Sequence, residues 1–158
     1  MPEWGYSITN LDPAKTVKCA GRELRVSHKA AREVCTAIKG MTLDQAKEYL
    51  NKVTVKKQPV PYRRYNKTLG HRHGIVNAFA ARYPVKTAKA MLKILEGAEA
   101  NAEFKGLDVE RLKIIHAAAY PGMKVKRFIQ RAFGRSSPKV QTLTHIEVVL
   151  EETEEKPV

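Results

Sequence analysis

The distribution of acidic residues constrains this chain more than any other feature of its sequence. No Asp or Glu occurs from Tyr49 to Leu95 or from Arg111 to Ile146, although both windows are rich in Lys and Arg. A solvated surface normally mixes charges of both signs, so two long acid-free windows are more than solubility requires. The pattern favours a polyanionic partner, with nucleic acid ahead of the two alternatives, an anionic membrane surface and an acidic protein.

The chain can nevertheless fold around a hydrophobic core. It has 158 residues, of which 43% are hydrophobic, and its formal net charge is +13. A chain of this length buries about 68–70% of its unfolded surface and needs no metal or disulfide to stabilise it. Residues 1–158 are therefore predicted to form a single domain. Cys19 and Cys35 do not form a C-x-x-C motif, and we interpret both as small buried hydrophobic residues.

No segment predicts insertion into a membrane or secretion. No apolar run reaches the roughly 18 residues that a membrane span needs. Residues 1–16 lack the apolar core of a signal peptide. We therefore expect a cytoplasmic protein with no membrane partner.

Three helices are predicted from apolar spacing and from the residues at their ends. The first is expected over residues 28–39 with Ser27 as its N-cap, and the second over residues 43–53. Thr42 and Gln45 form a capping-box pattern at the start of the second helix. The third helix is expected from Pro84 to about Lys105. Residues 6–20 are expected to be extended.

Two strands are predicted in the second half of the chain, from Leu112 to Ala119 and from Thr142 to Glu151. A basic segment of about 20 residues divides them, which suggests that an antiparallel pair continues outward as a ribbon about 50 Å long, at roughly 3.3 Å per residue. Residues 120–141 are thus predicted to form an extended hairpin arm, and residues 152–158 an acidic C-terminal tail. The predicted fold class is α+β, with three main helices packed on a small antiparallel sheet and a long β-hairpin extension.

Residues 55–83 are predicted to form a basic insert loop. Pro59 and Pro61 exclude a helix there, and a loop of this length in a compact domain is either functional or disordered. Tyr62 and Tyr65 lie among cations, which favours contact with RNA, at a surface separate from the arm. The candidate RNA-binding residues of the insert are Arg63, Arg64, Lys67, His71, Arg72 and His73.

The arm contains the most informative stretch of the sequence, residues 124–135. Its cations can contact phosphate, while its phenylalanines can stack on bases or wedge between RNA helices. The alternative is a solvated basic loop, which rarely needs two phenylalanines. The candidate RNA-binding residues of the arm are Lys124, Lys126, Arg127, Phe128, Arg131, Phe133, Arg135 and Lys139.

The sequence offers little support for catalysis. His71 and His73 are close together, but no Cys or acid lies near them at zinc-site spacing, so we predict no metal site and interpret them as RNA-facing donors. No phosphate-binding glycine motif and no carboxylate pair in an apolar setting is present. We expect no enzymatic activity and no cofactor.

The arm sequence also carries a family resemblance. Arg131-Ala132-Phe133-Gly134-Arg135, followed by Thr144-His145-Ile146-Glu147-Val148-Val149-Leu150, resembles the universal large-subunit ribosomal protein family with the exit-tunnel hairpin, number twenty-two of that series. The family pattern is R-A-x-G-R and then T-S-H-I-x-V-V, and this chain reads T-L-T-H-I-E-V-V. Shorter matches at residues 26–29, 38–40 and 99–103 occur in the family's order. The resemblance spans about Arg25 to Glu151, and the insert is typical of the archaeal and eukaryotic type.

This resemblance implies a structural constituent of the large ribosomal subunit in the cytoplasm. It implies binding to large-subunit rRNA, support of assembly, contacts with neighbouring large-subunit ribosomal proteins, and an arm that reaches the nascent-polypeptide exit tunnel. The tip facing the tunnel and the nascent polypeptide would comprise Arg131, Ala132, Phe133, Gly134 and Arg135. A free-standing RNA chaperone or regulatory RNA-binding protein is the alternative, and an enzyme acting on RNA is a more distant one.

Overall fold

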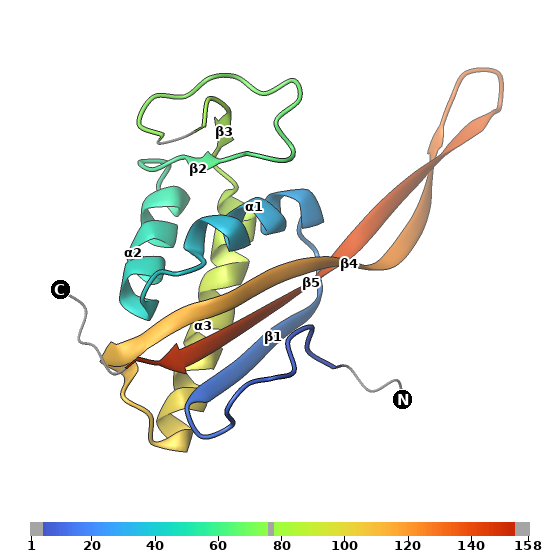
Figure 1. Cartoon of the computed structure of the whole chain (residues 1–158). Coiled ribbons are helices and arrows are strands. Elements are labelled where there is room, and N and C mark those ends of the chain that lie inside the picture. The colour runs from blue at the N-terminus through green and yellow to red at the C-terminus, as the bar shows by residue number, and fades with distance from the viewer. Residues whose placement is uncertain (1–4, 76–77, 154–158) are drawn as a thin grey trace.

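The computed structural model describes residues 5–75 and 78–153. A three-stranded antiparallel sheet lies at the centre, with the helices on one side of it (Figure 1). In chain order the elements are β1 (Thr16–Leu24), α1 (His28–Ile38), α2 (Leu43–Thr54), β2 (Val60–Pro61), β3 (Ala81–Arg82), α3 (Val85–Lys105), the 3-10 turn η1 (Val109–Arg111), β4 (Leu112–Gln130) and β5 (Ser136–Glu152). This arrangement confirms the predicted α+β class and its long hairpin.

The sheet has the strand order β1-β5-β4, so β5 is paired along both edges. Val148 of β5 is aligned with Cys19 of β1 and with Ala117 of β4. The sequence predicted extended chain up to residue 20, whereas β1 begins at Thr16 and continues to Leu24. A bulge interrupts its pairing with β5 between Gly21 and Leu24. The pairing of β1 with β5 places the first and last strands of the chain side by side.

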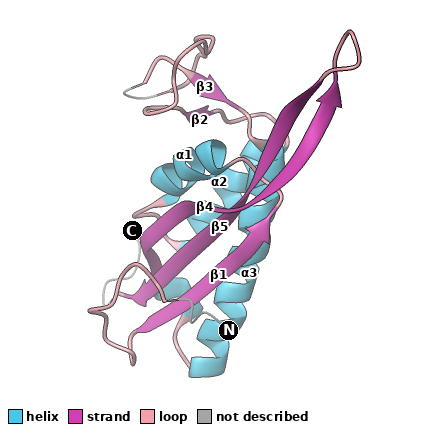
Figure 2. Cartoon of the chain, turned by 90° about the vertical axis from the view of Figure 1, so that its right-hand side faces the viewer, coloured by secondary structure: helices cyan, strands magenta, loops and turns pink. Residues whose placement is uncertain are grey.

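The hydrophobic core lies between the sheet and the helices. Ile146, Val148 and Leu150 of β5 are fully buried, as are Ile38 of α1 and Leu95 of α3. Figure 2 shows the helices behind the sheet, while the N-terminal segment lies near its other face. Alternate residues of β5 point to that other face.

The helices begin and end near the predicted residues, but not every N-cap residue makes a capping hydrogen bond. The capping box of Thr42 and Gln45 is present. Ser27 is the N-cap of α1, but its side chain makes no capping hydrogen bond. Pro84 is the N-cap of α3 rather than its first residue, one position away from the prediction. Gly106, with φ of 74°, ends α3 in the left-handed conformation that glycine adopts without strain.

β4 is an edge strand, and it runs from the core into the arm without ending. Pro121 is tolerated because an edge strand leaves some N–H groups unpaired, and the pairing register shifts between Pro121 and Lys124. Gly122 lies against His145, where an added Cβ would come within 2.6 Å of the imidazole Nε2. A side chain at position 122 would therefore force the His145 ring to move. It marks the point where the sheet leaves the body and becomes the arm.

The remaining features concern membrane spans, the two cysteines and the C-terminal end. No helix among the described residues is long and apolar enough to cross a membrane. Cys35 is buried, and burial raises the pKa of its thiol to about 12, whereas Cys19 is only half-buried. Thr153 donates a backbone hydrogen bond to the carbonyl of Arg111. The rest of the predicted acidic tail, residues 154–158, lies outside the described residues.

Candidate nucleic-acid interface

One buried carboxylate attaches the insert to the body. Glu33 lies on α1 and is only 1% exposed. It accepts hydrogen bonds from the backbone N–H groups of Arg63, Arg64 and Tyr65, each with an N···O distance of 3.1 Å. Successive N–H groups that converge in this way form an anion-binding concavity. Glu33 therefore holds the insert backbone against α1, although the described part of the insert contains only the short strands β2 and β3.

Buried side chains give the insert a second attachment. Val60 and Ala80 are fully buried, and Tyr62 is 6% exposed and belongs to the core. Burial raises the pKa of Tyr62 to about 12. The expectation that Tyr62 faces RNA is thus wrong, because Val60 and Tyr62, two residues apart, both turn into the core. Tyr65 remains partly accessible.

The predicted RNA-binding residues of the insert are all exposed, but they do not form one cluster. Arg64 and Lys67 line a hollow between the insert and the helices, whereas Arg63 lines a separate hollow beside Glu33. The guanidinium of Arg72 lies 5.8 Å from the ring centroid of Tyr83. The backbone hydrogen bonds of residues 63–65 direct neighbouring arginines to different sides, which spacing alone does not reveal.

The two histidines of the insert are in different surroundings. The ring of His71 lies 5.6 Å from that of Phe79, centroid to centroid, and both His71 and His73 are exposed. Within the described residues, no group of three or more His, Cys, Asp or Glu side chains is placed to hold a metal ion.

Beyond Tyr120, whose hydroxyl donates a hydrogen bond to Glu147, the arm is held by backbone pairing alone. From residue 120 to residue 141 no side chain is buried. The strands pair from Lys124 with Thr142 to Gln130 with Ser136. At the tip, the N–H of Arg131 donates to the carbonyl of Arg135 at 2.8 Å, and Gly134 has φ of 68°. Phe133 has φ of 57°, uncommon for a residue with a side chain, and is 95% exposed.

Cations lie on both faces of the arm. Arg127 is directly opposite Lys139, so two like charges face each other across the ribbon, an arrangement that destabilises an isolated hairpin. Lys124 and Lys126 lie on the other face, because side chains alternate along a strand. Phe128 is 71% exposed. A polyanion surrounding the arm would relieve the repulsion and cover the exposed ring.

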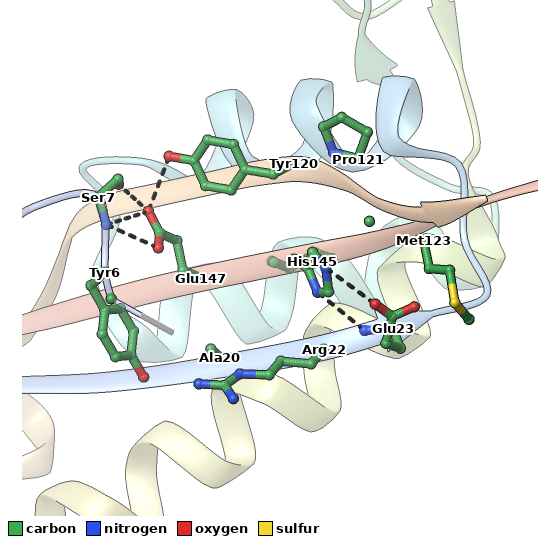
Figure 3. A pocket seen from close by; sticks show the side chains of 13 residues that line it. Tyr6, Ser7, Ala20, Arg22, Glu23, Tyr120, Pro121, Met123, His145 and Glu147 are labelled. Atoms are coloured by element: carbon green, nitrogen blue, oxygen red, sulfur yellow. Dashed lines mark hydrogen bonds and ion pairs between the residues drawn. The ribbon is translucent and has the colours of Figure 1, made fainter. Parts of the chain in front are cut away.

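Another hollow, of about 700 Å³, lies on the face of the sheet that points away from the helices (Figure 3). The carboxylate of Glu147 accepts hydrogen bonds there from the Ser7 backbone at 3.2 Å and from the hydroxyls of Ser7 and Tyr120. The Nε2 atom of His116 lies 3.0 Å from the Oε1 atom of Glu147. These groups attach the N-terminal segment to β4 and β5.

The electrostatics of this hollow do not suit a phosphate. Burial alone would raise the pKa of Glu147, but the hydrogen bonds from Ser7, His116 and Tyr120 outweigh burial and leave that pKa below its ordinary value. The carboxylate is therefore charged at neutral pH. Glu23 adds a second carboxylate, 3.3 Å from the Nε2 atom of His145. Figure 3 shows both carboxylates bonded to neighbouring groups, Glu147 to Ser7 and Tyr120 and Glu23 to His145, and sequence patterns alone did not predict this network.

Sequence reasoning also missed Glu33. One signal was available: Glu33 is the only acidic residue between Glu23 and Asp44, and it lies within the apolar stripe of a helix next to a basic loop. A lone acid in such a stripe is a candidate for a buried, hydrogen-bonded carboxylate.

Comparisons with known proteins agree with this architecture. The family model described as ribosomal protein L22p/L17e matches residues 19–151. Among curated relatives, the large ribosomal subunit protein uL22 of Ignicoccus hospitalis is 47% identical and covers 98% of this chain and 100% of its own length. The uL22 proteins of Methanocaldococcus jannaschii and Methanopyrus kandleri are 49% and 51% identical, covering 96% and 94% of this chain and 97% and 96% of their own lengths. The chain therefore belongs to the ribosomal protein L22p/L17e family.

Proposed function

We propose that this chain is a structural constituent of the large ribosomal subunit in the cytoplasm, that it binds large-subunit rRNA and that it supports assembly of the subunit. It acts by binding rather than by catalysis and needs no cofactor. Family membership over residues 19–151 supports this function, as do relatives named large ribosomal subunit protein over nearly their whole lengths. Neighbouring ribosomal proteins are further partners.

The arm is the observation that carries the proposal. Residues 120–141 contain no buried side chain, expose Phe128 and Phe133, and place cations on both faces. Two strands without a core are marginal in water, so the arm needs a surrounding partner. RNA supplies the negative charge and the stacking surfaces that these side chains require. The proposed RNA-binding residues are therefore those named from the sequence in the insert and the arm, within a single domain.

The tip of the arm is proposed to line the nascent-polypeptide exit tunnel. From Pro121 to Gly134 the arm extends about 40 Å, at roughly 3.3 Å per residue. An arm of this length can pass through a layer of RNA and present residues 131–135 beyond it. Phe133 is then available to a passing polypeptide.

The first test is co-sedimentation. The tagged chain, expressed in its own cells, should sediment quantitatively with the large subunit in a sucrose gradient. A free-standing RNA chaperone or regulatory protein would instead remain near the top of the gradient or spread over many fractions. That result would refute the ribosomal function.

The second test concerns the tunnel. A photoreactive phenylalanine analogue at Phe133 should crosslink to a nascent chain stalled on the ribosome. The control is the same analogue at Phe104, which is 93% exposed but lies at the end of α3 in the body. Crosslinks from position 104 but not from position 133 would refute the tunnel placement while leaving rRNA binding intact.

A further inference from the structure

A hollow of about 900 Å³ lies between the insert and the first turns of α1 and α3. No carboxylate lines it, and its five cationic side chains are Lys29, Arg64, Lys67, Arg82 and Lys86. These come from α1, the insert, β3 and α3. Cations that converge without an acid repel one another, so a bound anion would stabilise them. The hollow of Figure 3, with its two carboxylates, has the opposite character.

Two of the five cations of this hollow, Lys29 and Arg64, are held in place before any ligand arrives. Lys29 and Arg64 lie 5.6 and 5.9 Å from the ring centroid of Tyr65, so one ring holds cations from two elements. The backbone N–H groups of Arg64 and Tyr65 are themselves bonded to the buried carboxylate of Glu33. The site is therefore preorganised through a contact on the far side of the insert backbone.

Two helix starts also face the hollow. Neither Ser27 nor Pro84 caps its helix with a side-chain hydrogen bond, and α1 and α3 have 11 and 21 residues. Free N–H groups and the helix dipole make such starts favourable for anions. In addition, Thr87 lines the hollow and is only 3% exposed, and its hydroxyl is a further hydrogen-bond donor at the wall of the hollow.

A second, smaller hollow of about 480 Å³ continues from the first. The two share Val26, Ser27, Lys29 and Lys86, and the second reaches residues 140–142 at the base of the arm. Arg25 and His28 add to its lining, and no carboxylate does. An acid-free surface thus runs from the insert to the arm, with Lys29 and Lys86 at the junction.

We propose that the larger hollow binds a backbone phosphate of RNA through Lys29 and Lys86, and that the same RNA strand continues along the smaller hollow to the arm. This inference rests on the proposed rRNA binding and adds a specific site to it. The insert and the arm, expected from the sequence to be separate surfaces, then belong to one continuous RNA-binding track. Neither lysine was among the residues predicted from the sequence.

The test compares two double variants of the full chain, K29A/K86A and K89A/K93A. All four lysines are exposed, and Lys89 and Lys93 lie on α3 outside both hollows, so charge loss is matched. Binding to a transcript of large-subunit rRNA is measured as a function of salt. K29A/K86A should reduce the slope of log affinity against log salt by about 0.7 to 0.9, the value for the loss of one phosphate contact. K89A/K93A should leave the slope unchanged.

The outcomes of this test distinguish a failure of the proposed phosphate site from a failure of the proposed rRNA binding. If the wild-type chain shows no salt-sensitive binding to the transcript, the proposed rRNA binding itself fails. If the wild type binds and the two double variants behave alike, only the phosphate site is refuted. A second measurement is amine modification of the complex, in which Lys29 and Lys86 should be protected by RNA. Full reactivity of both lysines in the complex would also overturn the site.

Discussion

The insert and the arm, residues 55–83 and 120–141, are both basic and acid-free, yet they are attached to the body in different ways. The insert is bonded to Glu33 and buries Val60 and Tyr62. The arm buries no side chain, and beyond Tyr120 it is shaped only by the pairing of β4 with β5 (Figure 1). Positive charge therefore does not determine how ordered an RNA-binding surface is before RNA arrives. Attachment to the hydrophobic core determines how ordered such a surface is. The following experiments test this difference between the insert and the arm.

Amide hydrogen exchange should show the largest contrast. The N–H groups of Arg63, Arg64 and Tyr65 should exchange at least about 100-fold more slowly than those of residues 124–130, a difference of about 2.7 kcal/mol in opening free energy. The reason is that opening the insert exposes a buried carboxylate, whereas opening the arm exposes nothing buried. Equal protection in both regions of the free protein would remove the distinction between them.

Deleting the arm should have the next largest effect, on RNA binding. Residues 123–141 are replaced by an Asn-Gly turn, which removes the six cations Lys124, Lys126, Arg127, Arg131, Arg135 and Lys139. If each neutralises a phosphate, the slope of log affinity against log salt should fall by about 4 to 5, at roughly 0.7 to 0.9 per phosphate. The thermal midpoint should change little, because no core residue is lost. An unchanged slope would show that the arm contacts no phosphate.

Replacing Glu33 tests the insert. Glu33→Ala leaves three backbone N–H groups without their acceptor, and a buried unsatisfied donor costs about 1 to 3 kcal/mol. We expect the free energy of unfolding to fall by about 2 kcal/mol or more. The matched control, Glu96→Ala, removes an exposed acid from α3 and should cost less than about 0.5 kcal/mol. Equal effects of both variants in urea denaturation would refute the anchoring role.

The smallest expected effect concerns pH and the attachment of the N-terminal segment. The pKa of Glu147 is lower in the folded protein than its ordinary value of 4.5. Its charged form therefore contributes stability above pH 4.5, and this contribution disappears as the pH falls through the lower folded-state pKa. The difference in unfolding free energy between the wild type and Glu147→Gln should accordingly shrink between pH 6 and pH 3. A difference that grows on acidification would contradict this assignment.

The sequence predicted the helices and the arm because both depend on local signals. Apolar spacing marks α1, the capping box of Thr42 marks α2, and the acid-free stretch between two apolar strands marks the arm. Such signals lie within a few residues of each other, so they can be read without knowing the tertiary structure. The family resemblance then supplied the function that these signals leave open.

What the sequence did not show depends on contacts between distant segments. Glu33 bonds to residues about 30 positions away, and Ser7 bonds to Glu147 across 140 positions. The burial of Tyr62 and the convergence of Lys29 with Lys86 likewise follow from how α1, the insert and α3 pack. No local pattern encodes these pairings. For that reason the sequence predicted that Tyr62 contacts RNA and did not identify Lys29 or Lys86.

The continuity of β5 also limits how the arm can change in length during evolution. The same strand pairs with β1 in the body and with β4 in the arm, so the body fixes which side chains face which way at the base of the arm. Adding one residue to each strand would reverse the faces of every residue beyond the insertion, including the tip, unless a new bulge compensated. Adding two residues to each strand would preserve them. Natural arms of different length should therefore differ by multiples of four residues in total.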